Sequence, residues 1–185
     1  MVIVDVEATC WKDRQPPPGQ QSEIIEIGIC LFDPSTLTLS GKRSILIHPT
    51  RSKVSAFCTK LTTLTQARVA EEGIWFEDAC KILEEDYHTR SRTWASWGNY
   101  DQKMFAWQCE DRQVPYPFGE QHLNVKSTFG RLHGLSRNPG MSMALRMARL
   151  ELEGTHHRGH DDAWNIGRLL IHLVETFGSD LLQIS

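Results

Sequence analysis

The sequence predicts an α/β fold, a five-stranded mixed sheet with helices on its faces. Three observations support this prediction: an apolar, β-branched run at the start, two more strand patterns directly after it, and short strands that then alternate with helical patterns. Strand patterns that follow one another predict antiparallel neighbours, whereas strands separated by helices predict parallel ones. A chain of 185 residues can bury the core that one such domain requires.

Three strand patterns follow one another at the start of the chain. They cover residues 2–10, 23–32 and 37–48. The first two are rich in Val and Ile, which favour strands. The segment between them, residues 11–22, is polar and contains Pro16-Pro17-Pro18-Gly19, which predicts a loop. The second and third patterns meet at Asp33-Pro34-Ser35, so we expect them to form a hairpin that extends the sheet from the first strand.

The rest of the chain alternates helical patterns with two short strands. The expected helices cover residues 59–66, 75–87, 101–111, 127–135, 142–150 and 161–177, and the expected strands cover residues 93–97 and 123–125. In the last helix, Ile166, Leu169 and Leu173 recur on one face, which predicts that this helix packs against the sheet. This order of elements places helices on the faces of a mixed sheet.

Composition and charge argue against several classes of protein. The net charge is -3, so an anionic partner would need a local basic patch or a bound metal. The five cysteines are scattered, odd in number and without a C-x-x-C pair, which argues against a disulfide scaffold or a cysteine-rich zinc module. We find no signal-peptide pattern and no apolar stretch long enough to span a membrane. We therefore expect a soluble, cytoplasmic protein.

Asp5 and Glu7 alternate with aliphatic residues in the first strand. Residues i and i+2 of a strand share a face, so both carboxylates should project side by side from the end of a core element. Adjacent carboxylates repel each other and resist burial unless an opposite charge compensates them. A hard divalent cation bound through oxygen ligands provides that charge. The alternative is a frayed strand end with both groups in solvent.

Two further aspartates are candidates for the same cation site. Asp101 follows the Gly98-Asn99 turn at the start of a predicted helix, and its position suits a helix N-cap, a metal ligand or both. Asp162 lies four residues before Ile166 on the apolar face of the last helix, so its side chain should point toward the sheet. Its neighbour Asp161 is rotated by about 100° and should face solvent as the cap of that helix.

Three histidines, His156, His157 and His160, lie close together near the start of the last helix. A loop histidine beside carboxylates is a candidate general base because its pKa lies near neutral pH. His157, five residues before Asp162, is that candidate here, and a structural histidine is the alternative. The three histidines also raise the hypothesis of a zinc site, although their spacing matches no standard ligand set and no cysteine lies nearby.

Five segments, in this order, resemble the motifs of the DEDDh 3′-to-5′ exonucleases, whose fold is RNase H-like. They are Asp5-Val6-Glu7-Ala8-Thr9-Cys10, Glu23-Ile24-Ile25-Glu26-Ile27-Gly28, Cys58-Thr59-Lys60-Leu61-Thr62, Trp97-Gly98-x-x-Asp101 and Gly159-His160-Asp161-Asp162-Ala163-x-Asn165-Ile166. Within that superfamily they resemble the Eri-like branch, which contains the histone-mRNA 3′-end exonuclease of animals. Because the segments span nearly the whole chain, the resemblance implies one exonuclease domain over residues 1–185.

The resemblance implies a metal-dependent 3′-to-5′ exonuclease that hydrolyses single-stranded RNA to nucleoside 5′-monophosphates. The implied cofactors are two Mg²⁺ ions, for which Mn²⁺ would substitute. The implied partners are single-stranded RNA 3′ ends, with DNA possible. The implied catalytic residues are the metal ligands Asp5, Glu7, Asp101 and Asp162 and the general base His157. The implied substrate-binding residues are Glu7, Ala8, Leu61, Thr62, Tyr100 and His157.

The sequence departs from the family pattern at two positions and leaves alternatives open. Thr63 replaces a glycine that is common after Leu-Thr, and Tyr100 stands where a tryptophan is frequent. Both positions concern the packing of bases rather than the binding of metal. Scattered arginines, including Arg158, are candidates for contacts with upstream phosphates. The alternative functions are a 3′-to-5′ exodeoxyribonuclease, a zinc-dependent hydrolase and a catalytically idle nucleic-acid-binding module.

Overall fold

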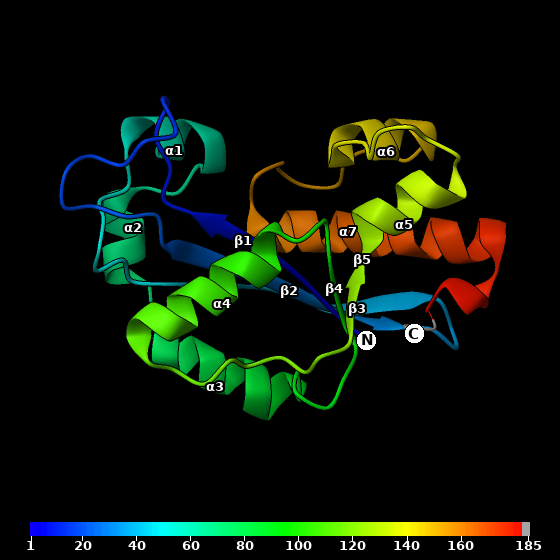
Figure 1. Ribbon diagram of the computed structural model, residues 1–185, viewed down its shortest axis with the longest axis horizontal. Coiled ribbons are helices and arrows are strands. Elements are labelled where there is room, and N and C mark those ends of the chain that lie inside the picture. Colours follow the sequence, from blue (N-terminus) through cyan, green and yellow to red (C-terminus); the bar gives the residue numbers. More distant parts are fainter. Residues whose placement is uncertain (183–185) are drawn as a thin grey trace.

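Five strands form one mixed sheet in the computed structural model, which describes residues 1–182 (Figure 1). The strands are β1 (Val2–Ala8), β2 (Ile24–Asp33), β3 (Thr38–Leu46), β4 (Trp94–Ser96) and β5 (His122–Asn124). Their order across the sheet is β3-β2-β1-β4-β5. The first three strands pair antiparallel, whereas β4 pairs parallel with both β1 and β5. The predicted five-stranded mixed sheet is confirmed.

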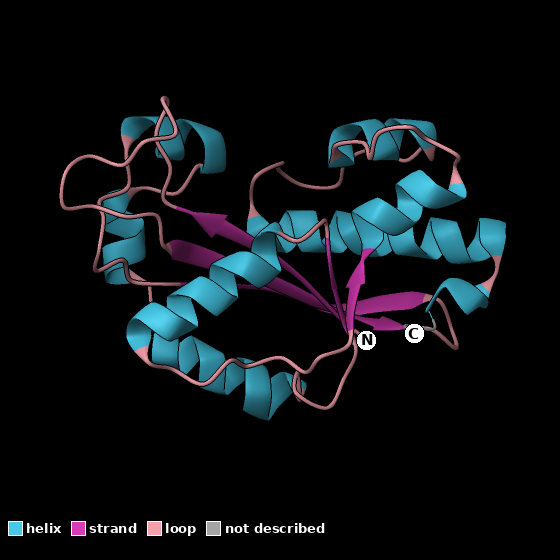
Figure 2. Ribbon diagram, viewed as in Figure 1, coloured by secondary structure: helices cyan, strands magenta, loops and turns pink. Residues whose placement is uncertain are grey.

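Helices cover both faces of this sheet (Figure 2). They are α1 (Ala56–Thr62), α2 (Gln66–Glu71), α3 (Phe76–Tyr87), α4 (Tyr100–Arg112), α5 (Val125–Leu132), α6 (Met141–Met147), α7 (Gly159–Phe177) and the 3-10 helix η1 (Ser179–Leu182). One core forms between the sheet and helices α3 and α4, and another between the sheet and helices α5, α6 and α7. Along β1, Val4 and Val6 lie in the first core and Ile3 in the second. Asp5 and Glu7 therefore share the α7 face with Ile3.

Most predicted elements are confirmed, with bounds that differ by up to three residues. The helix predicted over residues 59–66 is wrong in its extent, because two helices, α1 and α2, occupy this region. Helix α1 begins earlier than predicted, since Ser55 accepts a hydrogen bond from the Cys58 N–H and caps it. It ends at Thr62, because the C-cap residue Thr63 has a left-handed backbone with φ 63°. Thr65 then caps α2, so side-chain hydroxyls near both helix starts divide the segment.

Helix α7 packs on β1, β2 and β3. Gly28 on β2 permits this close approach, because a Cβ at that position would overlap the backbone of Gly159 and His160 at the start of α7. Gly28 is the partner of Asp5 in the β1–β2 ladder. The first turn of α7, which carries Asp162, is therefore brought against Asp5.

Within residues 1–182, no helix has the length and apolar character that crossing a membrane requires. The cytoplasmic compartment stays a prediction. The single exonuclease domain expected over residues 1–185 also stays a prediction, and residues 183–185 lie outside the described residues.

Candidate active site

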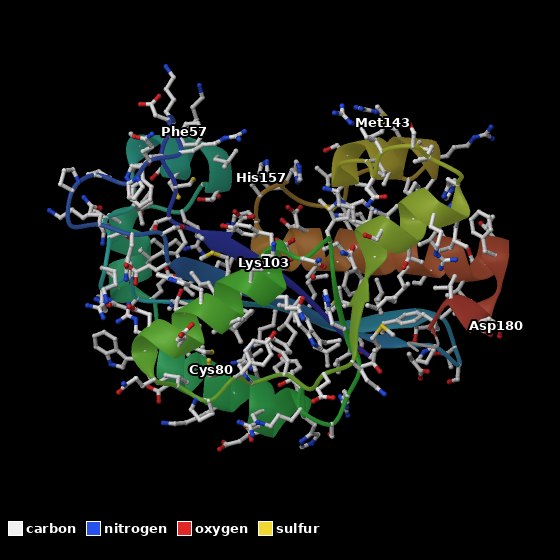
Figure 3. The ribbon with its side chains drawn as sticks, viewed as in Figure 1. Phe57, Cys80, Lys103, Met143, His157 and Asp180 are labelled. Carbon is white, nitrogen blue, oxygen red and sulfur yellow. The ribbon has the colours of Figure 1, made fainter. Side chains whose placement is uncertain are left out.

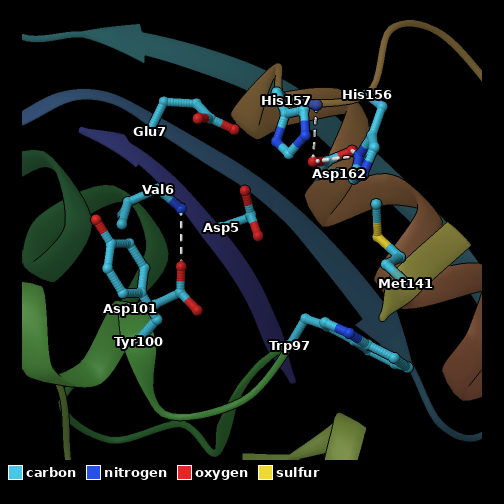
Figure 4. A pocket seen from close by; sticks show the side chains of 10 residues that line it. All are labelled: Asp5, Val6, Glu7, Trp97, Tyr100, Asp101, Met141, His156, His157 and Asp162. Atoms are coloured by element: carbon cyan, nitrogen blue, oxygen red, sulfur yellow. Dashed lines mark hydrogen bonds and ion pairs between the residues drawn. The ribbon is translucent and has the colours of Figure 1, made fainter. Parts of the chain in front are cut away.

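Asp5, Glu7 and Asp162 converge on the α7 side of the sheet. Each can place a carboxylate oxygen within 4.8 Å of the other two. Together with Asp101 they line a cavity of about 230 Å³ between β1, α4 and the start of α7 (Figure 4). Because Glu7, Asp101 and Asp162 are buried, the alternative of a frayed, solvent-exposed strand end is wrong. The four carboxylates that the sequence indicated thus lie in one place.

Asp101 is tied to the strand that carries Asp5 and Glu7. It is the second residue of α4, and the N-cap position belongs to Asn99, so the capping alternative for Asp101 is wrong. Its Oδ1 instead accepts a hydrogen bond of 2.9 Å from the Val6 N–H. This bond satisfies a backbone donor of β1 and fixes the start of α4 beside the other carboxylates.

No lysine or arginine side chain in the cavity wall balances the negative charge of these carboxylates. Burial, with repulsion from Asp101 and Glu7, raises the pKa of Asp5 well above its ordinary value. Burial, with repulsion from Asp162 and Glu26, raises the pKa of Glu7 to about 9. Burial likewise raises the pKa of Asp101 to about 6. Oxygen ligands that repel one another in this way fit a hard divalent cation.

His157 lies on the loop that leads into α7 (Figure 3) and lines the carboxylate cavity. Its backbone is left-handed, with φ 64°, and its N–H donates a hydrogen bond of 3.0 Å to Asp162 Oδ2. Burial lowers the pKa of the His157 imidazole, and the neighbouring His156 lowers it further. His157 is therefore present mainly as the neutral base at neutral pH.

His156 is a member of this site that the sequence indicated only as part of the zinc hypothesis. Its Nδ1 lies 3.0 Å from both carboxylate oxygens of Asp162, and its ring stacks on that of His157 with centroids 4.0 Å apart. The hydrogen bond to Asp162 raises the pKa of His156. Neighbouring histidines in a loop can each face a carboxylate, so sequence spacing could not show which one contacts Asp162.

The three histidines do not converge on one point. His156 and His157 lie together with Asp162, whereas the Nδ1 of His160 lies 3.0 Å from Glu26 Oε1 on β2. The arrangement therefore does not support a zinc site built from all three histidines.

Asp161 is buried, and the prediction that it faces solvent is wrong. Its carboxylate forms an ion pair with Lys42 of β3 and accepts a hydrogen bond of 2.7 Å from the Thr155 N–H. It is not the helix cap either, because Arg158 occupies the N-cap position. A helical projection gives the angle between neighbouring residues, but it does not show that β3 and the preceding loop cover the other side of α7.

Leu61 and Tyr100, which the sequence indicated as base-binding residues, line a second cavity of about 600 Å³. Trp11 and Phe57 also contribute to its wall. Tyr100 lines both this cavity and the carboxylate cavity, and it is 55% exposed. An aromatic surface therefore continues directly from the carboxylates.

Ala8 and Thr62 occupy different surroundings from these side chains. Ala8 ends β1, and its carbonyl accepts a weak hydrogen bond from Cys58 Sγ at 3.5 Å. The Thr62 hydroxyl is buried, donates to the Cys58 carbonyl and accepts from the Leu64 N–H. Because Thr62 lines neither cavity and its hydroxyl already donates one hydrogen bond and accepts another, the arrangement favours a structural role for its side chain over the predicted substrate contact.

Three further residues of the site were not identified from the sequence as functional. Trp97 and Met141 line the carboxylate cavity opposite β1. Glu26, on β2 opposite Glu7, is completely buried and forms an ion pair with Arg158. Arg158 is therefore engaged within the protein, and the arrangement favours this structural role over the predicted contact with upstream phosphates. A glutamate among the isoleucines of β2 was the signal that could have revealed this pair.

Comparison with known proteins identifies a family for most of the chain. Residues 2–170 match the RNase T family model, which is described as an exonuclease. Human 3′-5′ exoribonuclease 1 is 25% identical over 182 residues, which cover 94% of this chain and 52% of that protein. Probable 3′-5′ exonuclease KapD of Bacillus subtilis is 29% identical over 178 residues, which cover 95% of this chain and 84% of that protein. The chain thus spans about half the length of the human relative.

Comparison of structures gives the same result. The nuclease domain of 3′hExo, a DEDDh family member bound to rAMP, superimposes with a TM-score of 0.86 at 25% sequence identity. The match covers 95% of this chain and 92% of that one. The resemblance predicted from the motifs and the RNase H-like fold are both confirmed.

Proposed function

This chain belongs to the RNase T exonuclease family, and on that premise we propose that it is a metal-dependent 3′-to-5′ exonuclease of single-stranded RNA. The observation that carries the proposal is the convergence of four carboxylates and His157 in one cavity. Hydrolysis of a phosphodiester needs its negative charge neutralised and a water deprotonated. The carboxylates and the histidine supply the groups for these two tasks, with nucleoside 5′-monophosphates as the products.

The carboxylates are the proposed metal ligands, and exonucleases of the DEDDh type depend on metal ions. Asp5, Glu7 and Asp162 would hold a first ion and Asp101 would assist a second, with Mg²⁺ as the proposed cation and Mn²⁺ as its substitute. When bound, such ions neutralise the phosphodiester and lower the pKa of the attacking water. Raised carboxyl pKa values and the lack of a Lys or Arg in the cavity wall support this assignment.

His157 is the proposed general base. Its pKa is lowered by burial and by His156, so that a ring nitrogen can accept a proton from water at neutral pH. The hydrogen bond from the backbone N–H of His157 to Asp162 fixes the loop that carries this histidine beside the carboxylates. This position lets the imidazole act on a water while Asp162 serves as a ligand.

The RNA substrate would enter with its 3′ end first. Leu61 and Tyr100 offer apolar and aromatic surfaces for a terminal base, which a paired duplex would withhold. The ribose would lie near Glu7 and the backbone of Ala8. The similar nuclease domain of 3′hExo binds rAMP, which supports RNA over DNA as the substrate.

Matched 5′-labelled RNA and DNA oligonucleotides with a free 3′-hydroxyl test this proposal. We expect the RNA to shorten one nucleotide at a time from its 3′ end with Mg²⁺ or Mn²⁺ and to stay intact with EDTA. A 3′-terminal phosphate should slow the reaction, because it displaces the terminal ribose. DNA degraded as fast as RNA would favour an exodeoxyribonuclease. Cleavage of a circular RNA, or binding without hydrolysis, would contradict the proposed exonuclease.

A further inference from the structure

We propose that Glu26 is a positioning residue that holds the first turn of α7 and the loop before it, so that Asp162 and His157 face the carboxylates of β1. This inference rests on the proposed function, since it assigns Glu26 a task in the same site. Glu26 itself touches neither the carboxylate cavity nor the second cavity beside it.

The contacts of Glu26 converge from two separate elements. Glu26 is 0% exposed, and five hydrogen-bonding contacts reach its two oxygens. Oε1 accepts from Ser44 Oγ of β3 at 2.6 Å and from Arg158 Nη2 at 3.2 Å, and it lies 3.0 Å from His160 Nδ1. Oε2 accepts from Arg158 Nε at 3.1 Å and from the Gly159 N–H at 3.0 Å. Three consecutive residues at the start of α7 are thus held by one carboxylate.

The place of Glu26 in the sheet connects these contacts to the active site. Glu26 is the register partner of Glu7 in the β1–β2 ladder, so both side chains lie on the face that α7 covers. Two residues further along β2, Gly28 lets the backbone of Gly159 approach the sheet. The glycine removes the steric barrier, and the glutamate provides the attractive contacts.

Glu26 is not a further metal ligand, although it lies close to Glu7. Both of its oxygens already face hydrogen-bond donors, and the Arg158 guanidinium neutralises its charge. Asp5, by contrast, belongs to a group of carboxylates that can share a cation. The positions of these donors therefore separate the two roles.

The effect on the reaction follows from the order of residues along the chain. Arg158 and Gly159, which Glu26 holds, lie between His157 and Asp162. If the contact with Glu26 is lost, the general base and a metal ligand lose their fixed position together. Leu61 and Tyr100 lie on α1 and α4, so base binding does not depend directly on this contact.

Glu26→Gln tests the proposal in the full chain because it keeps the shape of the side chain and removes its charge. The matched control is Glu23→Gln. Glu23 is 1% exposed and accepts hydrogen bonds from Thr50, Arg51, Ser52 and Arg112, none of which belongs to α7. Both variants lose a buried, ion-paired glutamate, Glu23 directly before β2 and Glu26 within it, but only Glu26→Gln loses a contact with α7.

We expect Glu26→Gln to lower kcat for RNA by roughly 10–100-fold, since small displacements of reacting groups have effects of this size. Its KM should stay within about 2-fold of the wild type, because the base-binding residues are unchanged. Glu23→Gln should leave kcat within about 2-fold for folded protein at the same temperature. Equal loss of kcat in the two variants, or a rise in KM alone, would overturn the positioning role.

Two measurements that need no catalysis distinguish this inference from the proposed function. Hydrogen exchange of the His157 and Gly159 amides should accelerate in Glu26→Gln and not in Glu23→Gln, and calorimetric Mn²⁺ binding should weaken only in the former. If the wild-type protein degrades no RNA but the two variants differ in this way, the proposed function fails and the positioning role stands.

If Glu26→Gln does not fold, Arg158→Lys, which loses the paired donors but keeps the charge, should show the same selective loss of kcat. Unchanged exchange and Mn²⁺ binding in a folded variant would overturn the inference.

Discussion

Glu7 and Glu26 lie opposite each other on neighbouring strands, yet their surroundings differ in one respect. Both are buried, but Glu7 faces other carboxylates, whereas Glu26 is met by hydrogen-bonding groups from β3 and α7. Burial and Asp162 raise the pKa of Glu7 to about 9. Burial also acts to raise the pKa of Glu26, but hydrogen bonds from His160, Arg158 and Ser44 outweigh it and lower that pKa to about 2.

The comparison teaches that burial alone does not identify a functional carboxylate. A buried carboxylate with enough donors is stable as an ion and serves the fold. One without donors is unstable as an ion until a cation arrives, so it marks a place where a ligand is needed. In this molecule the two cases are separated by one strand spacing.

The largest effect is expected from Asp5→Asn, which tests the carboxylate region directly. Hydrolysis of labelled RNA should fall below detection, since Asp5 lies among the other three proposed ligands, Glu7, Asp101 and Asp162. Loss of one repelling charge should leave the metal-free variant melting no lower than metal-free wild type. Mg²⁺ should raise the melting temperature of the wild type more than that of the variant, because binding to the native state stabilises it. Full activity in Asp5→Asn would contradict the proposed site.

A smaller loss is expected from His157→Asn. Asparagine tolerates the left-handed backbone at this position, φ 64°, so the change removes the base with little added strain. Turnover should fall by roughly 10²–10⁴, the usual contribution of a positioned proton acceptor. Mn²⁺ affinity should change little if His157 is no ligand, as calorimetry can determine. A large loss of metal binding would instead place His157 with the ligands and revive the zinc alternative.

Tyr100→Ala should have a still smaller effect, confined to RNA binding. Loss of one aromatic stacking surface should weaken binding of a single-stranded RNA by about 1–3 kcal/mol. The affinity can be measured with Mg²⁺ in the His157→Asn background, in which turnover should be slow. Trp107→Ala is the control, because Trp107 is also a partly exposed aromatic residue of α4 but lines neither cavity. Equal weakening in both variants would contradict a specific role for Tyr100.

The alternation of residues in β1 predicted both the strand and the shared face of Asp5 and Glu7, because a strand has a fixed period of two. Asp162 was likewise predictable from its position on the apolar face of α7. These inferences depend only on local geometry, and the structure confirms them. The antiparallel pairing of β1, β2 and β3 followed from the same logic, since adjacent strand patterns without helices between them pair antiparallel.

Contacts between distant elements were not predictable from the same patterns. The burial of Asp161 depends on Lys42 of β3, and the role of Arg158 depends on Glu26 of β2. No local period indicates which distant strand covers the far side of a helix. Glu26 was visible as a charged residue within a run of isoleucines, but a single strand pattern does not say which donors meet it.

The smallest effect is expected in the pH dependence of stability of the metal-free protein, which tests the comparison of the two glutamates. A carboxyl group whose pKa rises on folding destabilises the native state as pH rises from its unfolded pKa to its folded pKa. Glu7, with a pKa of about 9, should therefore lower the stability of the protein between pH 7 and pH 9 in EDTA. Glu26, with a pKa of about 2, stabilises the fold above its unfolded pKa and loses this contribution only in acid, so it adds no slope in this range.

The lowered pKa values of His122 and His157 leave this window unaffected, because their contributions change only as pH falls below about 6.5. The raised pKa values of Asp5 and His156 act in the same direction as that of Glu7, whereas the lowered pKa values of the Met1 amino group and the Cys109 thiol act against it. We expect the melting temperature in EDTA to fall by a few degrees between pH 7 and pH 9, given about 2–4 °C per kcal/mol for a chain of this size. Saturating Mg²⁺ should reduce the fall, and Asp5→Asn should show a smaller one, since each relieves repulsion at Glu7. A melting temperature that rises over this range in EDTA would contradict the unpartnered state of Glu7 and, with it, the difference between the two glutamates.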